Sequence, residues 1–243
     1  IDYESKVSYG NWRNDFIIVS DDVDKDWEHE TLQVNLDNLG NEVSIERPLM
    51  NVKKIHSDSY QQIASAGGDR YPEVNNAIEN ATEVGALVIN YFGHGGEDGL
   101  ASEFIFTKGT AQDLRNKYKY PCIITVTCEF TKFDNPSRIT AGELSFWNKE
   151  GGAISLLTTT RSIGAALGVR FNQELAPQLF GYGLNIPNTP AESLRISKNQ
   201  VSDGSGNRRV IFYIGDPAMH LAFPKEQIKL TTLNGVPIEQ ATD

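Results

Sequence analysis

The chain has 243 residues, and its 22 Lys and Arg against 32 Asp and Glu give a formal net charge of −10. A chain of this length can bury a core without disulfide or metal cross-links. The acidic balance argues against a nucleic-acid partner, because such binding depends on basic side chains that neutralise phosphates. No apolar run approaches the ~20 residues of a membrane-spanning helix, so the sequence predicts a globular protein.

Short runs rich in β-branched residues predict six strands. The runs cover residues 16–19, 49–55, 86–92, 122–127, 153–158 and 210–214. Runs without polar alternation are typical of strands that are buried on both faces, as in parallel sheets. We therefore expect a mainly parallel sheet that is covered by helices.

Helix signals lie between these strands. Pro72 stands at a first-turn position and is followed by apolar residues at helical spacing up to Ala81. Thr140 and Glu143 form a capping-box pattern ahead of a second helix, and a third is expected over residues 167–180. Alternating strands and helices predict an α/β fold.

The pattern changes near the end of the chain. Residues 228–233 form an alternating run that leads into Asn234-Gly235, a hairpin-type turn. We therefore assign residues 1–225 to the α/β domain. Residues 226–243 are expected to be the start of a following β domain or a linker.

Two strand ends carry residues suited to catalysis. The strand expected over residues 86–92 ends in a glycine-rich turn around His94, and the one over residues 122–127 ends at Cys128. The carboxyl ends of parallel strands face the ligand crevice, so neighbouring strands would bring both side chains together. An imidazole can take the proton of a thiol whose pKa is otherwise about 8.5. With the amides of Gly95 and Cys128 as oxyanion donors, the pattern predicts acyl transfer to water or to an amine.

The other candidate ligands fit structural roles better. Cys122 and Cys128 lie on one predicted strand, roughly 20 Å apart if extended, which is too far for a disulfide. We interpret Cys122 as a small buried hydrophobic residue. The acidic cluster at residues 21–26 lacks the Gly and distal Glu of a calcium loop, so we interpret it as a solvated turn. No metal or cofactor is predicted, because neither Cys nor His has metal-ligand spacing.

The motifs around His94 and Cys128 resemble those of the clan CD cysteine peptidases, which include caspases, legumains, clostripain and gingipains. Within that clan the chain is most similar to the gingipain family. The stretches that carry the resemblance are YGNWRN at residues 9–14, GGDRYP at 67–72, NYFGHGGE at 90–97, TCEF at 127–130 and GDP at 215–217.

The resemblance implies a caspase-like fold, with helices on both faces of the sheet and the peptidase domain over residues 1–225. It implies that Cys128 is the nucleophile, that His94 is the general base and acid, and that Gly95 and Cys128 supply the oxyanion amides. The acidic residue that orients His94 stays open. Asp58 is the candidate by position, and Glu129, beside the nucleophile, is the competitor.

Within the family the likeness is to the sortases of the bacterial type IX secretion system. It implies an endopeptidase at the cell surface, on the outer membrane, that cleaves the C-terminal signal domain of secreted cargo. The expected partners are that cargo, anionic lipopolysaccharide as the acceptor and other components of the secretion system. Two alternatives stay open, a secreted protease that only hydrolyses and a non-catalytic module that binds signal domains. A binding module has no need of a thiol, an imidazole and glycine amides at adjacent strand ends, so we favour the enzyme.

Overall fold

The computed structural model describes residues 2–201, 204, 206–224, 231–234 and 236–240. The strands form a six-stranded sheet of order β2-β1-β3-β7-β8-β9, in which only β9 is antiparallel to its neighbour. This confirms the predicted strands and the mainly parallel sheet. The bounds are β1 (Asp15–Ser20), β2 (Asn51–His56), β3 (Val88–Phe92), β7 (Cys122–Val126), β8 (Ser155–Thr159) and β9 (Ile211–Ile214).

The inner strands are apolar because both of their faces are covered. Every residue of β1, β3, β7 and β8 is buried, whereas the edge strand β2 is largely exposed. Successive side chains of a strand point to opposite faces. In β1, Phe16 and Ile18 therefore enter one hydrophobic core, and Ile17 and Val19 enter the other.

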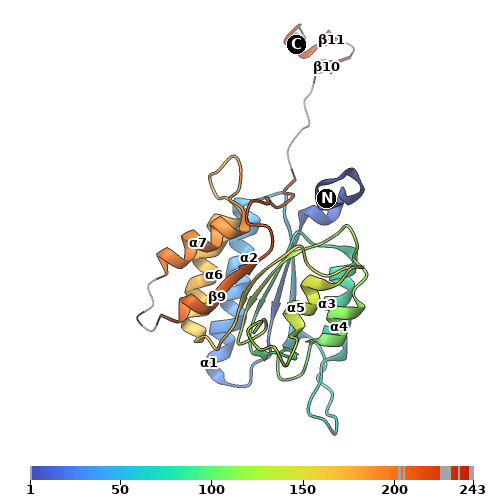
Figure 1. Ribbon diagram of the computed structural model, residues 1–243. Helices are drawn as coiled ribbons and strands as arrows, with labels where there is room; N and C mark the ends of the chain where they lie inside the picture. Colours follow the sequence, from blue (N-terminus) through green and yellow to red (C-terminus); the bar gives the residue numbers. More distant parts are fainter. Residues whose placement is uncertain (1, 202–203, 205, 225–230, 235, 241–243) are drawn as a thin grey trace.

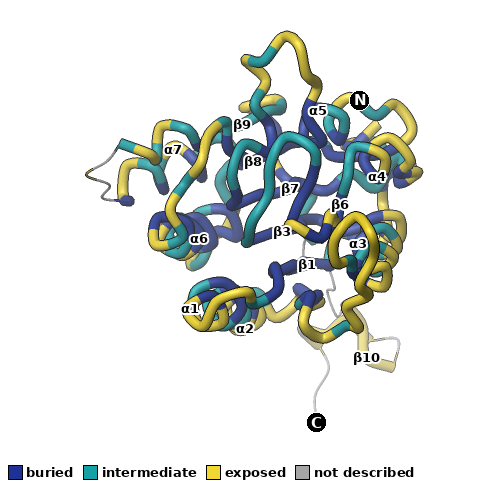
Figure 2. Tube along the Cα trace, turned by 90° about the horizontal axis from the view of Figure 1, so that it is seen from below, coloured by how far each residue is buried: buried dark blue, intermediate teal, exposed yellow. Residues whose placement is uncertain are grey.

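Helices cover both faces of the sheet (Figure 1). One layer holds α2 (Asn35–Glu46), α6 (Ala165–Leu179) and α7 (Pro190–Gln200), and the other holds α3 (Pro72–Val84), α4 (Lys108–Asp113) and α5 (Ala141–Trp147). Viewed along the strands, the buried sheet lies between these layers (Figure 2). The three predicted helices are confirmed as α3, α5 and α6.

The connection after β1 is more elaborate than the sequence suggested. It leads through α1 (Asp26–Glu28) and a π-helical stretch (His29–Val34) into α2, which was not predicted. The predicted capping box is confirmed at the start of α5. Thr140 Oγ1 accepts the Glu143 N–H, and the Glu143 carboxylate accepts the Thr140 N–H.

Two small sheets accompany the main one. A three-stranded antiparallel sheet follows β3 and contains β4 (Gly95–Gly96), β5 (Gly99–Leu100) and β6 (Phe106–Thr107). In the tail, β10 (Thr232–Leu233) pairs with β11 (Val236–Pro237), so the expected hairpin is present at Asn234. Residues 228–230 of the strand expected there lie outside the described residues, and the assignment of the tail to a following domain stays a prediction. Short 3₁₀ helices complete the chain at Asp2–Glu4, Lys6–Ser8, Asn11–Asn14, Ser57–Ser59, Asn207–Val210 and Ile238–Gln240.

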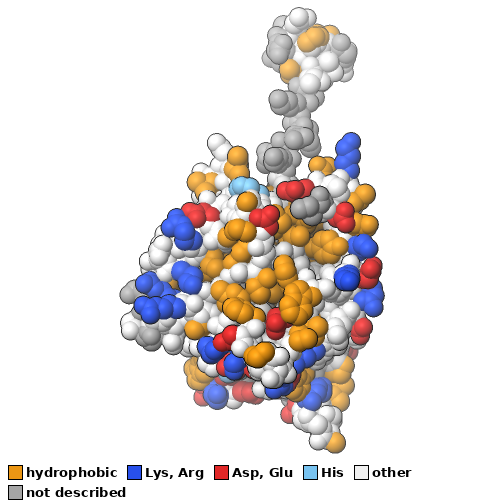
Figure 3. All heavy atoms as spheres, in the orientation of Figure 1, with side chains coloured by type: hydrophobic (Ala, Val, Ile, Leu, Met, Phe, Trp, Pro, Cys, Tyr) orange, Lys and Arg blue, Asp and Glu red, His pale blue; other side chains and the backbone are white. Residues whose placement is uncertain are grey.

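The visible face in Figure 3 mixes acidic and basic side chains around a central group of hydrophobic ones. Among the described helices, none has the length and apolar character needed to span a bilayer. Two cavities of about 530 and 680 Å³ lie beside Tyr120 and Ile154 and beside Trp12 and Asp15. These residues stand at or just before the amino ends of the strands, opposite the end where the catalytic candidates lie.

Candidate active site

The sheet order brings the two predicted catalytic strand ends together. β3 and β7 are adjacent and parallel, with Phe92 opposite Val126. The Gly93 N–H donates to the Val126 carbonyl at 3.4 Å, which extends the pairing beyond the strand. His94 and Cys128 each follow two residues after this last pair. They therefore lie at the same edge of the sheet, as the sequence predicted.

The site also lies where the strand order reverses. After β1 the chain forms β2 on one side of β1 and then β3 on its other side. The connections that leave β1 and β3 diverge at such a switch point and form a crevice at the carboxyl ends of the strands. The segment after β1 is thus placed beside His94.

That segment supplies the carboxylate that contacts His94. Glu28 Oε1 lies 3.1 Å from His94 Nε2, and the Glu28 side chain is fully buried while that of His94 is 45% exposed. A carboxylate can only accept, so this contact places the hydrogen on Nε2 and leaves Nδ1 as the basic nitrogen. Glu28 therefore selects the tautomer that a general base needs.

Backbone amides hold Glu28 ionised in this position. Glu28 Oε2 accepts the N–H groups of Asp24 and Lys25, both at 2.9 Å. Burial by itself would raise the pKa of the Glu28 carboxyl, but the hydrogen bonds from His94 and these amides outweigh it and lower the pKa. The Glu28 carboxylate is therefore already held in position when His94 takes up a proton.

The backbone of His94 is fixed on both sides. Asp21 Oδ2 accepts the His94 N–H at 2.6 Å, and the Tyr91 hydroxyl donates to the His94 carbonyl at 2.5 Å. The same carbonyl accepts the Ala101 N–H from the turn after β5. The imidazole is thus carried by a loop that can shift little without breaking buried hydrogen bonds.

The Gly95 amide points away from the small sheet and lies close to the cysteine loop. Because the His94 carbonyl bonds Ala101, Gly95 and Leu100 form a non-hydrogen-bonded pair, which directs the Gly95 N–H away from β5. A Cβ on Gly95 would lie 2.6 Å from Thr127 Oγ1, directly before Cys128. Only glycine therefore lets this amide lie so close to the cysteine loop.

The cysteine loop has a backbone conformation that is uncommon for its sequence. Glu129, directly after Cys128, has a φ of 52°, a left-handed value that glycine adopts most readily. Lys132 then bridges this loop to the histidine loop, at 3.2 Å from Glu129 and 3.3 Å from Glu97. Among the described residues the partly exposed Cys128 thiol has no hydrogen-bond partner. Catalytic hydrogen bonds are often long in ligand-free proteins and shorten when substrate binds.

Neither acidic residue proposed from the sequence contacts His94. Asp58 is exposed and accepts a hydrogen bond from Gln33 at 2.6 Å, while Glu129 pairs with Lys132. Asp58 follows β2 and His94 follows β3. Because β1 lies between these two strands and neighbouring strands are about 4.8 Å apart, Asp58 is kept away from His94. The structure places Glu28 beside His94 instead.

The prediction of a solvated turn at residues 21–26 is wrong for Asp21 and Asp22. Asp21 and Asp22 are only 1% and 6% exposed. They extend a buried strand and are covered by the segments around Tyr71 and Glu103, so water does not solvate them.

The remaining cysteine and histidines fit the structural roles expected of them. Cys122 is a free, fully buried thiol, and burial raises its pKa to about 12. His29, His56 and His220 each make a hydrogen bond, to Gln33, Ser20 and the Pro187 carbonyl respectively. Cys122 therefore cannot substitute for Cys128 as a nucleophile near neutral pH.

Comparison with known proteins agrees with this geometry. The sequence pattern of peptidase family C25 matches residues 1–222. The chain belongs to this family. It is thus a member of a family of cysteine peptidases, which bears out the gingipain resemblance. A separate comparison with curated protein sequences found no match.

Solved structures show the same fold. The Arg-specific cysteine proteinase gingipain R has a TM-score of 0.68 and 16% identity over 88% of this chain and 49% of its own. The complex of the Porphyromonas gingivalis RgpB pro- and mature domains has a TM-score of 0.64 and 16% identity over 87% of this chain and 49% of its own. A structure described as a protease has a TM-score of 0.65 and 14% identity over 90% of this chain and 51% of its own. The chain spans about half the length of these proteins, and the predicted α/β fold is confirmed.

Glu28 is the candidate site residue that the sequence analysis did not identify. Several acidic residues follow the first strand within eight positions, and the pattern does not say which of them becomes buried. Glu28 stands three residues after Lys25, which is the spacing of a capping box. Such a box is recognised by Ser or Thr at the first position, and Lys25 is neither.

Proposed function

We propose that the chain is a cysteine peptidase that works through an acyl-enzyme on Cys128. The observation that carries this proposal is the contact between His94 Nε2 and the buried Glu28 carboxylate, at the strand end beside the Cys128 loop. That contact leaves Nδ1 as a base and supports the imidazolium once it takes a proton.

The steps follow from these positions. His94 Nδ1 takes the proton of the Cys128 thiol, and the sulfur attacks the carbonyl carbon of the scissile bond. The oxyanion that forms is bound by the amides of Gly95 and Cys128. As it collapses, the C–N bond breaks and the imidazolium gives its proton to the leaving amine. Water or a second amine, deprotonated by Nδ1, then attacks the thioester, and the thiol leaves with the proton.

We further propose a role in type IX secretion. The support for this role is the resemblance of the five sequence stretches to PorU, the sortase that removes the C-terminal signal domain of secreted cargo. In this role the chain acts at the outer face of the outer membrane. Its partners are cargo proteins, other components of the secretion system and an amine acceptor on anionic lipopolysaccharide.

The first experiment uses the two cysteines as matched controls. Wild type, Cys122→Ala and Cys128→Ala are treated briefly at pH 6 with a small panel of peptidyl acyloxymethyl ketones, and intact masses are measured. We expect one adduct on wild type and Cys122→Ala and none on Cys128→Ala. Labelling that survives loss of Cys128, or that appears only above about pH 8 as for ordinary thiols, contradicts the peptidase proposal and favours a binding module.

A second experiment separates transfer from hydrolysis. A reporter fused to the C-terminal signal domain of a type IX cargo is incubated with the chain, with and without an added amine. Mass spectrometry of the reporter then shows either a free carboxyl end or an amide with the added amine. Amide product that depends on Cys128 supports the sortase, free acid alone supports a hydrolytic protease, and an uncut reporter contradicts the secretion role.

A further inference from the structure

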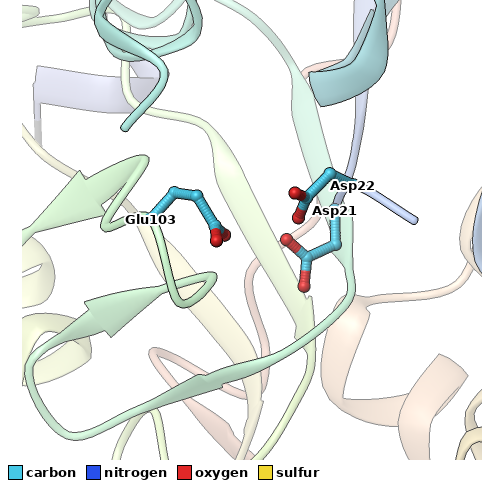
Figure 4. Close-up of side chains that lie close together, drawn as sticks. All are labelled: Asp21, Asp22 and Glu103. Atoms are coloured by element: carbon cyan, nitrogen blue, oxygen red, sulfur yellow. The ribbon is translucent and has the colours of Figure 1, made fainter. Parts of the chain in front are cut away.

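Three buried carboxylates converge behind the histidine loop (Figure 4). Asp21 and Asp22 follow β1, and Glu103 comes from the turn between β5 and β6. One carboxylate oxygen from each lies within 4.8 Å of the other two. The three residues are only 1%, 6% and 7% exposed. Figure 4 shows the Glu103 carboxylate facing the two aspartates across a small gap.

Protein donors satisfy only part of this cluster. Asp21 Oδ2 accepts the His94 N–H, but the buried Asp21 Oδ1 has no hydrogen-bond partner. Asp22 Oδ2 accepts from the Tyr71 hydroxyl at 3.3 Å and from the Gln62 side-chain amide at 3.4 Å. Among the described residues, no Lys or Arg forms an ion pair with any of the three carboxylates. The cluster therefore combines an unsatisfied buried oxygen with uncompensated negative charge.

We propose that Asp21, Asp22 and Glu103 form a binding site for a divalent cation, with Ca²⁺ as the preferred ion. Buried charges are paired or bind metals, and carboxylate oxygens suit hard cations. Ca²⁺ binds oxygen at about 2.3–2.6 Å, so ligands on opposite sides of the ion lie up to about 5 Å apart. The observed spacing of the three oxygens is within that limit.

The cluster is also connected to the loop that carries His94. A cation bound by Asp21 would hold this side chain in place, and Asp21 Oδ2 accepts the His94 N–H. Asp21 also packs against Gly93 with no room for a side chain there. The cation site is thus joined to the loop that carries the general base.

Isothermal titration calorimetry of the metal-free chain with Ca²⁺ tests the site directly. We expect one site per chain in wild type, binding at least tenfold weaker in Asp22→Asn and in Glu103→Gln, and unchanged binding in Asp26→Asn. Asp26 is the matched control, because it is an exposed aspartate of the same segment outside the cluster. The absence of binding to wild type, or equal binding by all four proteins, overturns the proposal.

A crystal grown with Mn²⁺ or Tb³⁺ locates the ion without any variant, which guards against variants that fail to fold. An anomalous peak between the three carboxylates supports the site, and a peak only elsewhere overturns it. The effect on His94 rests on the proposed function and is read separately. Removing Ca²⁺ with EGTA should slow Cys128 labelling at least threefold in wild type and leave Glu103→Gln unaffected. Metal binding without any Cys128 labelling would contradict the peptidase and leave the metal site intact.

Discussion

Replacing Glu28 by Gln isolates the role of the buried carboxylate. The substitution keeps the side-chain length but removes the charge that supports the His94 imidazolium at 3.1 Å. A hydrogen bond to a charged group contributes about 1.5–3 kcal/mol, and we take about 1.5–2 kcal/mol because the imidazole is nearly half exposed. At about 1.36 kcal/mol per factor of ten, Cys128 should react roughly 10- to 30-fold more slowly.

The Glu28→Gln substitution also affects which ring nitrogen of His94 carries the hydrogen. A carboxamide that donates to Nε2 would place the imidazole hydrogen on Nδ1, where the base must be free. The expected loss is therefore a lower bound. The assay is the second-order rate of Cys128 labelling by a peptidyl acyloxymethyl ketone, measured by intact mass across pH 5–8.

Asp58→Asn is the matched control, because it makes the same chemical change at an exposed carboxylate that bonds Gln33. It should alter the rate less than about twofold. Glu28→Gln that labels at the wild-type rate while remaining folded would refute the reasoning. So would a loss in Asp58→Asn as large as that in Glu28→Gln.

Three further predictions follow from named contacts. Gly95→Ala places a Cβ 2.6 Å from Thr127 Oγ1 and should displace the oxyanion amide, which lowers the labelling or cleavage rate by about 10²-fold; the double variant with Thr127→Ala should recover part of that rate, and no recovery would point to another cause. Thr140→Ala removes the buried capping box of α5 and should cost about 1–2 kcal/mol in urea unfolding with little change in the rate of labelling. Because the pKa of Glu28 is lowered on folding, its contribution to stability is present above the ordinary Glu value of about 4.3 and is lost as pH falls through the folded value; the stability difference between wild type and Glu28→Gln should therefore shrink below about pH 4, and a difference that grows there would contradict the sign.

Local sequence signals were sufficient for the strands and for the two catalytic strand ends. The runs that become β1, β3 and β7 are apolar throughout because both faces are covered, and that requirement is visible in the sequence. His94 and Cys128 follow directly from the ends of two such runs. The helix α2 also had a usable signal, since Leu36, Leu39 and Val43 repeat at helical spacing and are buried.

The identity of the acidic partner depended on information that is not local. Which strand lies beside β3 is settled by tertiary packing, and the choice of β1 brings the segment with Glu28, not the one with Asp58, to His94. Burial of Asp21 and Asp22 depends in the same way on distant segments around Tyr71 and Glu103. A composition that looks like a solvated turn gave no sign of this.

The pairing order of the sheet also bears on when the site can form during folding. Phe16 pairs with Val88, and Val88 pairs with Cys122, so each contact closes a long stretch of chain. Such long-range parallel pairings form late and slowly, because loop-closure entropy must be overcome before they stabilise the fold. Glu28, His94 and Cys128 follow β1, β3 and β7, so a partly folded species that lacks any of these three adjacent strands does not have all three residues in place. Reactivity of Cys128 should therefore appear only once β1, β3 and β7 have paired, which makes it a direct reporter of the assembly of the central sheet.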